Sequence, residues 1–241
     1  MRNHLAEHAS KRRKKRFGPA RSDLLDKHAA RGHQQFNLWY HYSARLQRDL
    51  IFSSDAEFEH FCWLEGDPQV LTYEPQPEPL IVAVGSNVHR TQFDACVELR
   101  GQRPELREVK EADLGLSVRE ENQREAQLIA ANQAGFTYRR ITRVDLDEHR
   151  QLIQNWRRAL AFMAACRDLV LIPFRDELME RFRDRSHSTI RELLLGTDPA
   201  LEPIYLSAIF LALQHYLLTS DLDSAPLCAN TKLMFHKDRH D

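Results

Sequence analysis

The order of elements predicted between residues 54 and 144 most constrains the fold of this chain. Ser54 is a favourable N-cap with Glu57 three residues later, and apolar side chains at helical spacing follow as far as Gly66. Short strands are then predicted over residues 70–73, 80–84, 88–99 and 106–110. A charged helix over residues 117–134 and a strand over residues 136–142 complete the segment. This order predicts an α/β core around a small mixed sheet.

From residue 146 the pattern changes to helices. They are predicted over residues 149–166, 175–182, 189–195 and 203–218, with a turn at residues 224–226 and a strand at residues 231–235. Helices followed by two short extended pieces are typical of a winged helix. We therefore expect an arm over residues 1–20, an α/β domain over residues 21–145 and a mostly helical, winged-helix-like domain over residues 146–241.

Composition places the chain among soluble globular proteins, because 42% of its 241 residues are hydrophobic and 29% are charged. No apolar run reaches the roughly 18 residues that span a bilayer, and no apolar signal core follows the basic N-terminus. The four cysteines lie far apart without metal-ligand spacing, which argues against a structural zinc site and a disulfide framework. We accordingly expect no contact with a membrane.

The net charge of −1 hides a strong asymmetry. Residues 1–50 contain 12 Lys and Arg against 4 Asp and Glu, and the densest run is KRRKKR at residues 11–16. Lys11, Arg12 and Arg13 are therefore candidates for contact with a nucleic acid. A solvated tail and a nuclear import signal are the alternative interpretations of this arm.

The stretch TQFDACVELRGQRPELREVK, residues 91–110, carries the candidate chemistry. It is predicted to form a β-hairpin with a turn at residues 101–104, in which Glu108 and Lys110 point to one face because they lie two residues apart. Asp94 is expected in the first strand, and folding at the turn brings it close to Lys110. Two acids and a lysine therefore converge at one end of the hairpin.

Such a group suits metal-assisted hydrolysis of a phosphodiester. Mg²⁺ prefers carboxylate oxygens, offsets charge on the phosphate and lowers the pKa of a bound water, and Mn²⁺ is expected to substitute for it. Lys110 would hold that water or the phosphate, and Glu57 would supply a third carboxylate. The alternative is a cross-strand ion pair on a solvated sheet face, and for Glu57 a plain capping role.

Four ordered blocks carry a resemblance to a known family. They are SDAEFEHF (54–61), DPQVLTYEPQP (67–77), QFDA (92–95) and EVK (108–110). In this order they resemble the restriction-endonuclease-like fold with its PD-(D/E)xK motif, and more narrowly the TnsA-like endonuclease subunits of heteromeric cut-and-paste transposases. The resemblance covers residues 53–144. It departs from the family at Phe93, where a proline is usual, and Glu59 competes with Glu57 for the helix position.

The resemblance implies both site residues and partners. Glu57, Asp94 and Glu108 would hold the metal and Lys110 would assist the attacking water. The implied reaction is cleavage of the non-transferred strand, at the 5′ ends, of transposon DNA. The implied partners are a DDE-type, TnsB-like transposase subunit and a regulatory, TnsC-like ATPase docked on the C-terminal domain, in the bacterial cytoplasm.

Four further polar residues are candidates for DNA contact. Gln76 would position a phosphate or the lysine strand, or serve only turn geometry, and Gln92 would line the site. Arg139 and Arg140 would contact the backbone, or lie on a solvated strand face.

Three hypotheses of function follow. The first is the transposase endonuclease subunit, and the second is a stand-alone nuclease of the same fold in restriction or repair. The third is a non-catalytic DNA-binding or assembly protein. Partner-independent cutting distinguishes the second hypothesis, and DNA affinity without metal-dependent cutting distinguishes the third.

Overall fold

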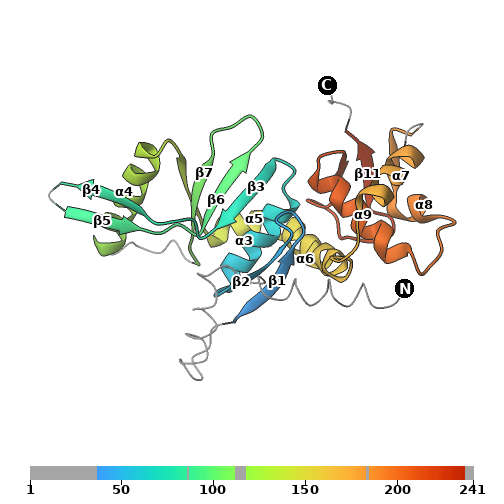
Figure 1. Cartoon of the computed structure of the whole chain (residues 1–241), viewed down its shortest axis with the longest axis horizontal. Helices are drawn as coiled ribbons and strands as arrows, with labels where there is room; N and C mark the ends of the chain where they lie inside the picture. The colour runs from blue at the N-terminus through green and yellow to red at the C-terminus, as the bar shows by residue number, and fades with distance from the viewer. Residues whose placement is uncertain (1–36, 86, 112–117, 183–184, 237–241) are drawn as a thin grey trace, which may run out of the picture.

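The computed structural model describes residues 37–85, 87–111, 118–182 and 185–236, which form a mixed α/β structure. The basic arm of residues 1–20, with Lys11, Arg12 and Arg13, lies outside the described residues. Figure 1 shows the described chain elongated, with a hairpin and one helix at one end and the C-terminal helices at the other. Within the described ranges, no helix combines the length and apolarity needed to cross a bilayer.

A four-stranded mixed sheet occupies the middle of the chain, as the sequence predicts. Its spatial order is β3-β6-β7-β8, with antiparallel pairing up to β7 and parallel pairing between β7 and β8. The strands are β3 (Val70–Pro75), β6 (Ala95–Leu99), β7 (Glu105–Val109) and β8 (Thr137–Ile141). Alternate residues face opposite sides, so Val97 and Val109 join the main core while Leu106 packs toward the other face.

Helix α3 (Asp55–Gly66) covers one face of this sheet. It begins where the sequence predicts, because the Ser54 side chain accepts a hydrogen bond from the Glu57 amide at 3.1 Å. Before it, β1 (Trp39–Ser43) and β2 (Arg48–Phe52) form an antiparallel hairpin that packs on the same helix. The ring of Trp39 stacks on Phe58 with 4.2 Å between centroids.

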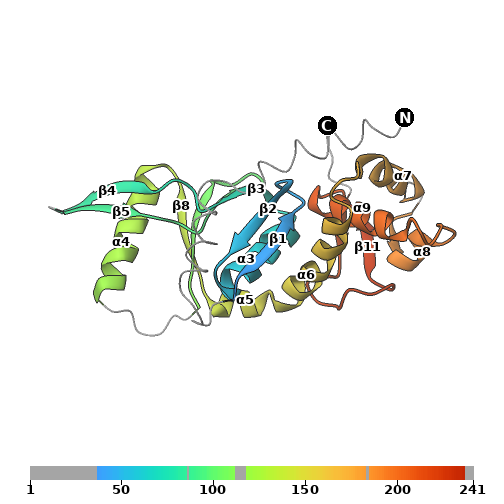
Figure 2. The ribbon, with the colours of Figure 1, turned by 60° about the horizontal axis from the view of Figure 1, so that its bottom comes forward.

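The expectation of one strand over residues 88–99 is wrong. The segment divides into β5 (Asn87–Thr91) and β6, and β5 pairs with β4 (Leu80–Val84) in a separate hairpin. This hairpin packs on α4 (Val118–Gln133) through a small apolar cluster of Val82, Ala126 and Ala130. Between the two strands, the fully buried Phe93 anchors the chain against the sheet and turns its direction. Figure 2 shows α4 and the hairpin side by side.

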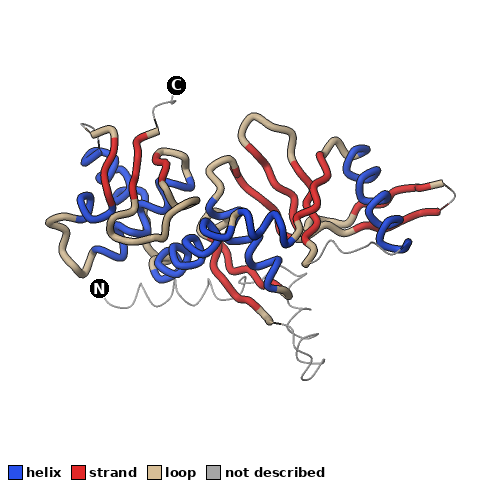
Figure 3. Tube along the Cα trace, turned by 180° about the vertical axis from the view of Figure 1, so that it is seen from behind, coloured by secondary structure: helices blue, strands red, loops and turns tan. Residues whose placement is uncertain are grey.

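The C-terminal part is mostly helical, as expected, with a small antiparallel sheet of order β10-β11-β9. Its elements are α5 (Arg143–Glu148), α6 (Arg150–Ala165), α7 (Ile172–Phe182), β9 (His187–Thr189), α8 (Ile190–Leu194), α9 (Glu202–Gln214), β10 (Leu218–Ser220) and β11 (Lys232–Phe235). The helix expected over residues 203–218 ends at Gln214, because Tyr216 takes a positive φ of 58° and the chain continues as β10. Figure 3 shows these short strands among the helices of that end.

The core is continuous from the sheet into the C-terminal part. Trp156 of α6 is 1% exposed and packs against Gly66 at the end of α3 and against Phe210 of α9. One apolar cluster includes residues of α3, the sheet, α6 and α9. The two domains predicted on either side of residue 145 therefore share one buried core.

A buried polar junction reinforces this contact. The carboxylate of Glu65, which has no exposed surface, accepts hydrogen bonds from Tyr73 Oη at 2.6 Å, Ser43 Oγ at 2.5 Å and Gln214 Nε2 at 2.6 Å. Arg45 donates to the backbone carbonyl of Glu65 at 3.1 Å. The last turn of α3 is thus joined to β1, β3 and α9.

Candidate active site

Asp94 lies directly before β6, rather than within the strand as expected. Its backbone amide donates to the carbonyl of Arg107 at 2.9 Å, and its carboxylate Oδ2 accepts from the Val109 amide at 2.7 Å. The Gln76 amide donates to the Asp94 carbonyl at 2.8 Å. Three backbone contacts thus fix Asp94 against the two strands that flank β6.

Glu108 and Lys110 lie beside Asp94 at the end of β7. Glu108 is 5% exposed, and the Lys110 Nζ is 2.6 Å from its Oε1. The Lys110 amide donates to the Ile141 carbonyl at 2.8 Å, which carries the parallel β7–β8 pairing one residue past the strand. Asp94 and Glu108 line the same groove. The structure therefore brings these two acids and the lysine together.

Glu57 lies near Asp94, on the α3 side of the sheet. Both residues line a small cavity between α3 and the strands. The Glu57 carboxylate also accepts from Ser53, at 2.9 Å from Oγ and 3.3 Å from the amide, so the predicted capping box is only half formed. Glu57 therefore approaches the acidic pair from α3, while Glu108 approaches it from β7.

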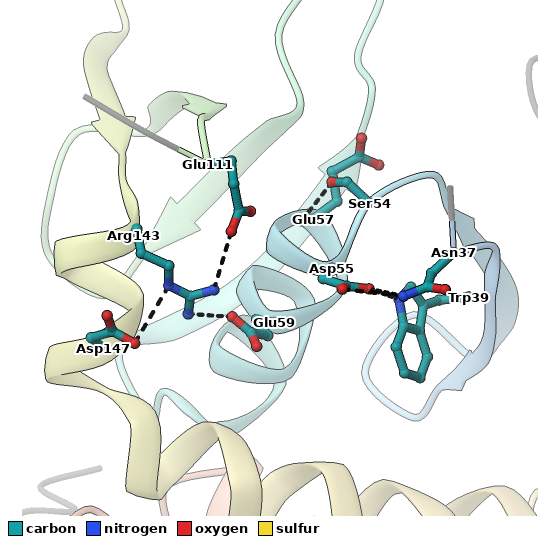
Figure 4. A network of polar contacts seen from close by, with 9 residues as sticks. All are labelled: Asn37, Trp39, Ser54, Asp55, Glu57, Glu59, Glu111, Arg143 and Asp147. Carbon is teal, nitrogen blue, oxygen red and sulfur yellow. Dashed lines mark hydrogen bonds and ion pairs between the residues drawn. The ribbon is translucent and has the colours of Figure 1, made fainter. Parts of the chain in front are cut away.

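Glu59, the competitor for the helix position, is directed elsewhere. It forms an ion pair with Arg143, which also lies 3.8 Å from Glu111 and 3.4 Å from Asp147. Figure 4 shows Glu59 pointing to this guanidinium, whereas the carboxylate of Glu57 points away from it. Of the two glutamates, Glu57 is the one that shares a cavity with Asp94.

The carboxylates of the site repel one another. Burial, and after it the charge of Glu108, raises the pKa of the Asp94 carboxyl, and Glu57 adds to the effect. The hydrogen bond from the Val109 amide and the charge of Lys110 oppose the shift without cancelling it. A divalent cation held by Asp94 and Glu108 would offset this repulsion.

A magnesium ion fits the donors present. The described residues contain no group of three or more His, Cys, Asp or Glu side chains placed together for a metal. Mg²⁺ commonly takes one or two carboxylates and keeps several waters. Asp94 and Glu108 would therefore hold the ion, and Glu57, whose carboxylate is bonded to Ser53, would be a further acid beside them.

The other predicted residues lie around this centre. Gln92 lines the groove with Asp94, and Gln76 meets Asp94 through its backbone, with a positive φ of 49°. Arg140 stands opposite Glu108 in the β7–β8 register. Arg139 lies on the α3 side instead, with its guanidinium 5.3 Å from the Trp63 ring centroid and 4.0 Å from Asp145.

Sequence reasoning missed two residues next to the acids. His60 lines the cavity of Glu57, and burial together with the nearby charges of Arg107 and Arg139 lowers its pKa well below the ordinary value, so the ring is neutral. Its position three residues after Glu57 on a helix was the available signal. Tyr138 lies near Glu108, and burial and that charge raise its pKa to about 12. Strand alternation with Arg140 could have placed it on the Glu108 side.

No protein-family model and no curated protein matches this sequence.

Proposed function

We propose that this protein is a Mg²⁺-dependent DNA endonuclease centred on Asp94, Glu108 and Lys110. The observation that carries the proposal is the meeting of two carboxylates and a lysine at one end of β7, with Lys110 Nζ 2.6 Å from Glu108. Two mutually repelling, largely enclosed carboxylates favour a divalent cation. The groove beside them opens to solvent, as a polymeric substrate requires.

The arrangement of elements supports a restriction-endonuclease-like fold. A helix with a candidate acid precedes an antiparallel strand pair that carries Asp94 and the Glu-x-Lys sequence. A further helix and a strand parallel to β7 follow. The four sequence blocks of the TnsA-like resemblance lie on these elements in the same order.

Each residue of the site would have a distinct task. Asp94 and Glu108 would hold the metal, with Glu57 as the third acid, and a bound Mg²⁺ would offset charge on the scissile phosphate and acidify a water. Lys110, whose ammonium has three donors, would orient the attacking water or the phosphate while Glu108 keeps it in place. The backbone contacts of Asp94 hold its carboxylate in fixed register with β7.

The narrower proposal is a TnsA-like subunit of a heteromeric transposase that cuts the 5′, non-transferred strand at transposon ends. The C-terminal order of helix, strand, two helices and two strands, with β11 between β9 and β10, supports a winged-helix domain. That domain would dock the TnsC-like ATPase, and the TnsB-like subunit would cut the other strand. The bacterial cytoplasm is the proposed compartment.

Nicking of supercoiled plasmid that carries candidate transposon ends tests the proposal. The purified chain is assayed in Mg²⁺ and in Mn²⁺, with and without the neighbouring transposase subunits. We expect metal-dependent nicking that Lys110→Ala and Asp94→Asn each reduce by at least about 100-fold. Lys232→Ala is the matched control, because Lys232 is an exposed lysine on β11.

The outcomes separate the hypotheses. Nicking that needs the partner subunits supports a transposase subunit, and sequence-specific nicking by the chain alone supports a stand-alone nuclease. If the complete mixture cuts equally well with Lys110→Ala and Asp94→Asn, this site is not the nuclease centre. DNA affinity without cutting in any mixture would make the chain a binding or assembly protein.

A further inference from the structure

The groove that contains Asp94 and Glu108 has a second wall that the nuclease chemistry does not use. The groove has a volume of about 860 Å³. Strand β5 and the exposed side of α4 form this wall, which contributes His89, Arg90, Asn122 and Gln123. The wall therefore belongs to the same open space as the proposed cutting site.

Among its described residues, this wall presents no acidic side chain to the groove. Helix α4 carries Glu120, Glu121 and Glu125, yet its residues that line the groove are Val118, Asn122, Gln123 and Ala126. Among the described residues lining the groove, the acidic ones are Asp94 and Glu108 alone. A helix rich in glutamate thus turns carboxamides toward the groove, which suits a polyanionic ligand.

The wall is held at a fixed distance from the acids. The Gln127 side chain, 2% exposed, donates from Nε2 to the Gln92 carbonyl at 3.2 Å and accepts from Tyr138 Oη at 3.0 Å. These bonds join α4 to the loop before Asp94 and to β8. The apolar contact of Val82 with Ala126 fixes the hairpin to the same helix.

We propose that Asn122 and Gln123 form a base-reading wall, which recognises duplex DNA beside the bond that is cut. An Asn or Gln carboxamide makes two hydrogen bonds to the edge of one adenine, so these side chains distinguish bases rather than merely holding phosphates. The inference rests on the proposed nuclease function, which defines the polymer in the groove.

Selection from a random duplex library in Ca²⁺ tests the wall apart from cleavage. The full chain with Lys110→Ala serves as the background, so that bound DNA stays intact. We expect enriched sequences with preferred bases at a few positions. Adding Gln123→Ala or Asn122→Ala should reduce the preference at one position on the order of 10-fold, because each paired contact is lost.

Gln133→Ala is the matched control, since Gln133 is an exposed glutamine of the same helix outside the groove. It should leave every preference unchanged. Gln123→Glu supplies a second variant, and its added negative charge should weaken binding to all sequences. Circular dichroism checks that each variant keeps its fold.

The results distinguish this inference from the nuclease proposal. If Gln123→Ala changes the base preferences but the parent chain nicks DNA in no mixture, the wall is supported and the nuclease proposal is overturned. If nicking depends on Lys110 but substitution of Asn122 or Gln123 changes no base preference, the wall is overturned and the nuclease remains. A library without any enriched sequence also overturns the wall.

Discussion

Replacing Gly66 by alanine tests how closely α3 packs on the C-terminal part. Gly66 is the last residue of α3 and does not have a positive φ, so alanine is compatible with its backbone. A Cβ there would lie 2.6 Å from Nε1 and 2.7 Å from Cγ of the Trp156 indole. Because ordinary contacts begin at about 3.5 Å, the buried indole would have to move by about 1 Å.

The magnitude follows from two opposing effects. Alanine is favoured over glycine in a helix by about 1 kcal/mol. Overpacking a core commonly costs about 1–3 kcal/mol, and the upper value applies because Trp156 is itself held against Phe210. We expect the free energy of unfolding to fall by about 2 kcal/mol, which lowers Tm by about 4–8 °C for a chain of this size.

Urea and thermal unfolding followed by far-ultraviolet circular dichroism measure this change. Trp156→Phe removes the crowded indole atoms. The Gly66→Ala/Trp156→Phe double variant should therefore lose less stability than the sum of the losses in the two single variants. Gly101→Ala is the control, because Gly101 has a φ of 63° and open space around it. The stability that this variant loses should be the same with Trp156 and with Phe at that position. A Gly66→Ala chain as stable as the parent would refute the packing described.

Three further expectations concern charge and capping. Burial and the charge of Glu108 raise the pKa of Asp94 to about 7. Between about pH 4 and pH 7 the folded state therefore binds a proton that the unfolded state has lost. The free energy of unfolding falls as the pH rises through this range. In urea titrations, Asp94→Asn should therefore be more stable than the parent at pH 8 and equally stable near pH 3.5. Mg²⁺ should reduce the difference in stability at pH 8. Equal stability of the two chains at both pH values would contradict the raised pKa of Asp94. Glu65→Ala leaves buried donors without an acceptor and should lower the free energy of unfolding by about 3 kcal/mol or more. The control Glu74→Ala removes an exposed ion pair and should lower it by less than about 1 kcal/mol. Similar losses of stability in the two variants would count against the buried junction. Ser54→Ala should cost about 1 kcal/mol in the same assay, and no loss would mean that the cap of α3 is dispensable.

Local signals in the sequence were sufficient for the elements that have clear ends. The cap at Ser54 predicted the start of α3, and the Gly-Asp-Pro sequence after it predicted the end. Strand alternation at Glu108 and Lys110 predicted their common side of β7, and the hairpin turn brought Asp94 into register with them. Each of these inferences depends on contacts within about 20 residues of chain.

Features that depend on distant contacts were not predicted. The break between β5 and β6 has no Gly or Pro, and it arises because Phe93 is buried against the sheet while β5 turns to pack on α4. The β1–β2 hairpin was missed because most of β2 is buried, which removes the alternation of a half-exposed strand. The buried Glu65 reads in the sequence as an ordinary charged helix residue.

Helix α3 connects two distant regions as a stiff rod. Glu57 is in its first turn and Glu65 in its last, eight residues apart and hence about 12 Å along the axis. Gln214 of α9 donates a hydrogen bond to the Glu65 carboxylate at 2.6 Å, so the last turn of this helix is fixed to the C-terminal part. Its first turn carries Glu57 into the cavity that Asp94 also lines. The candidate site and the C-terminal helices are therefore joined by one continuous element.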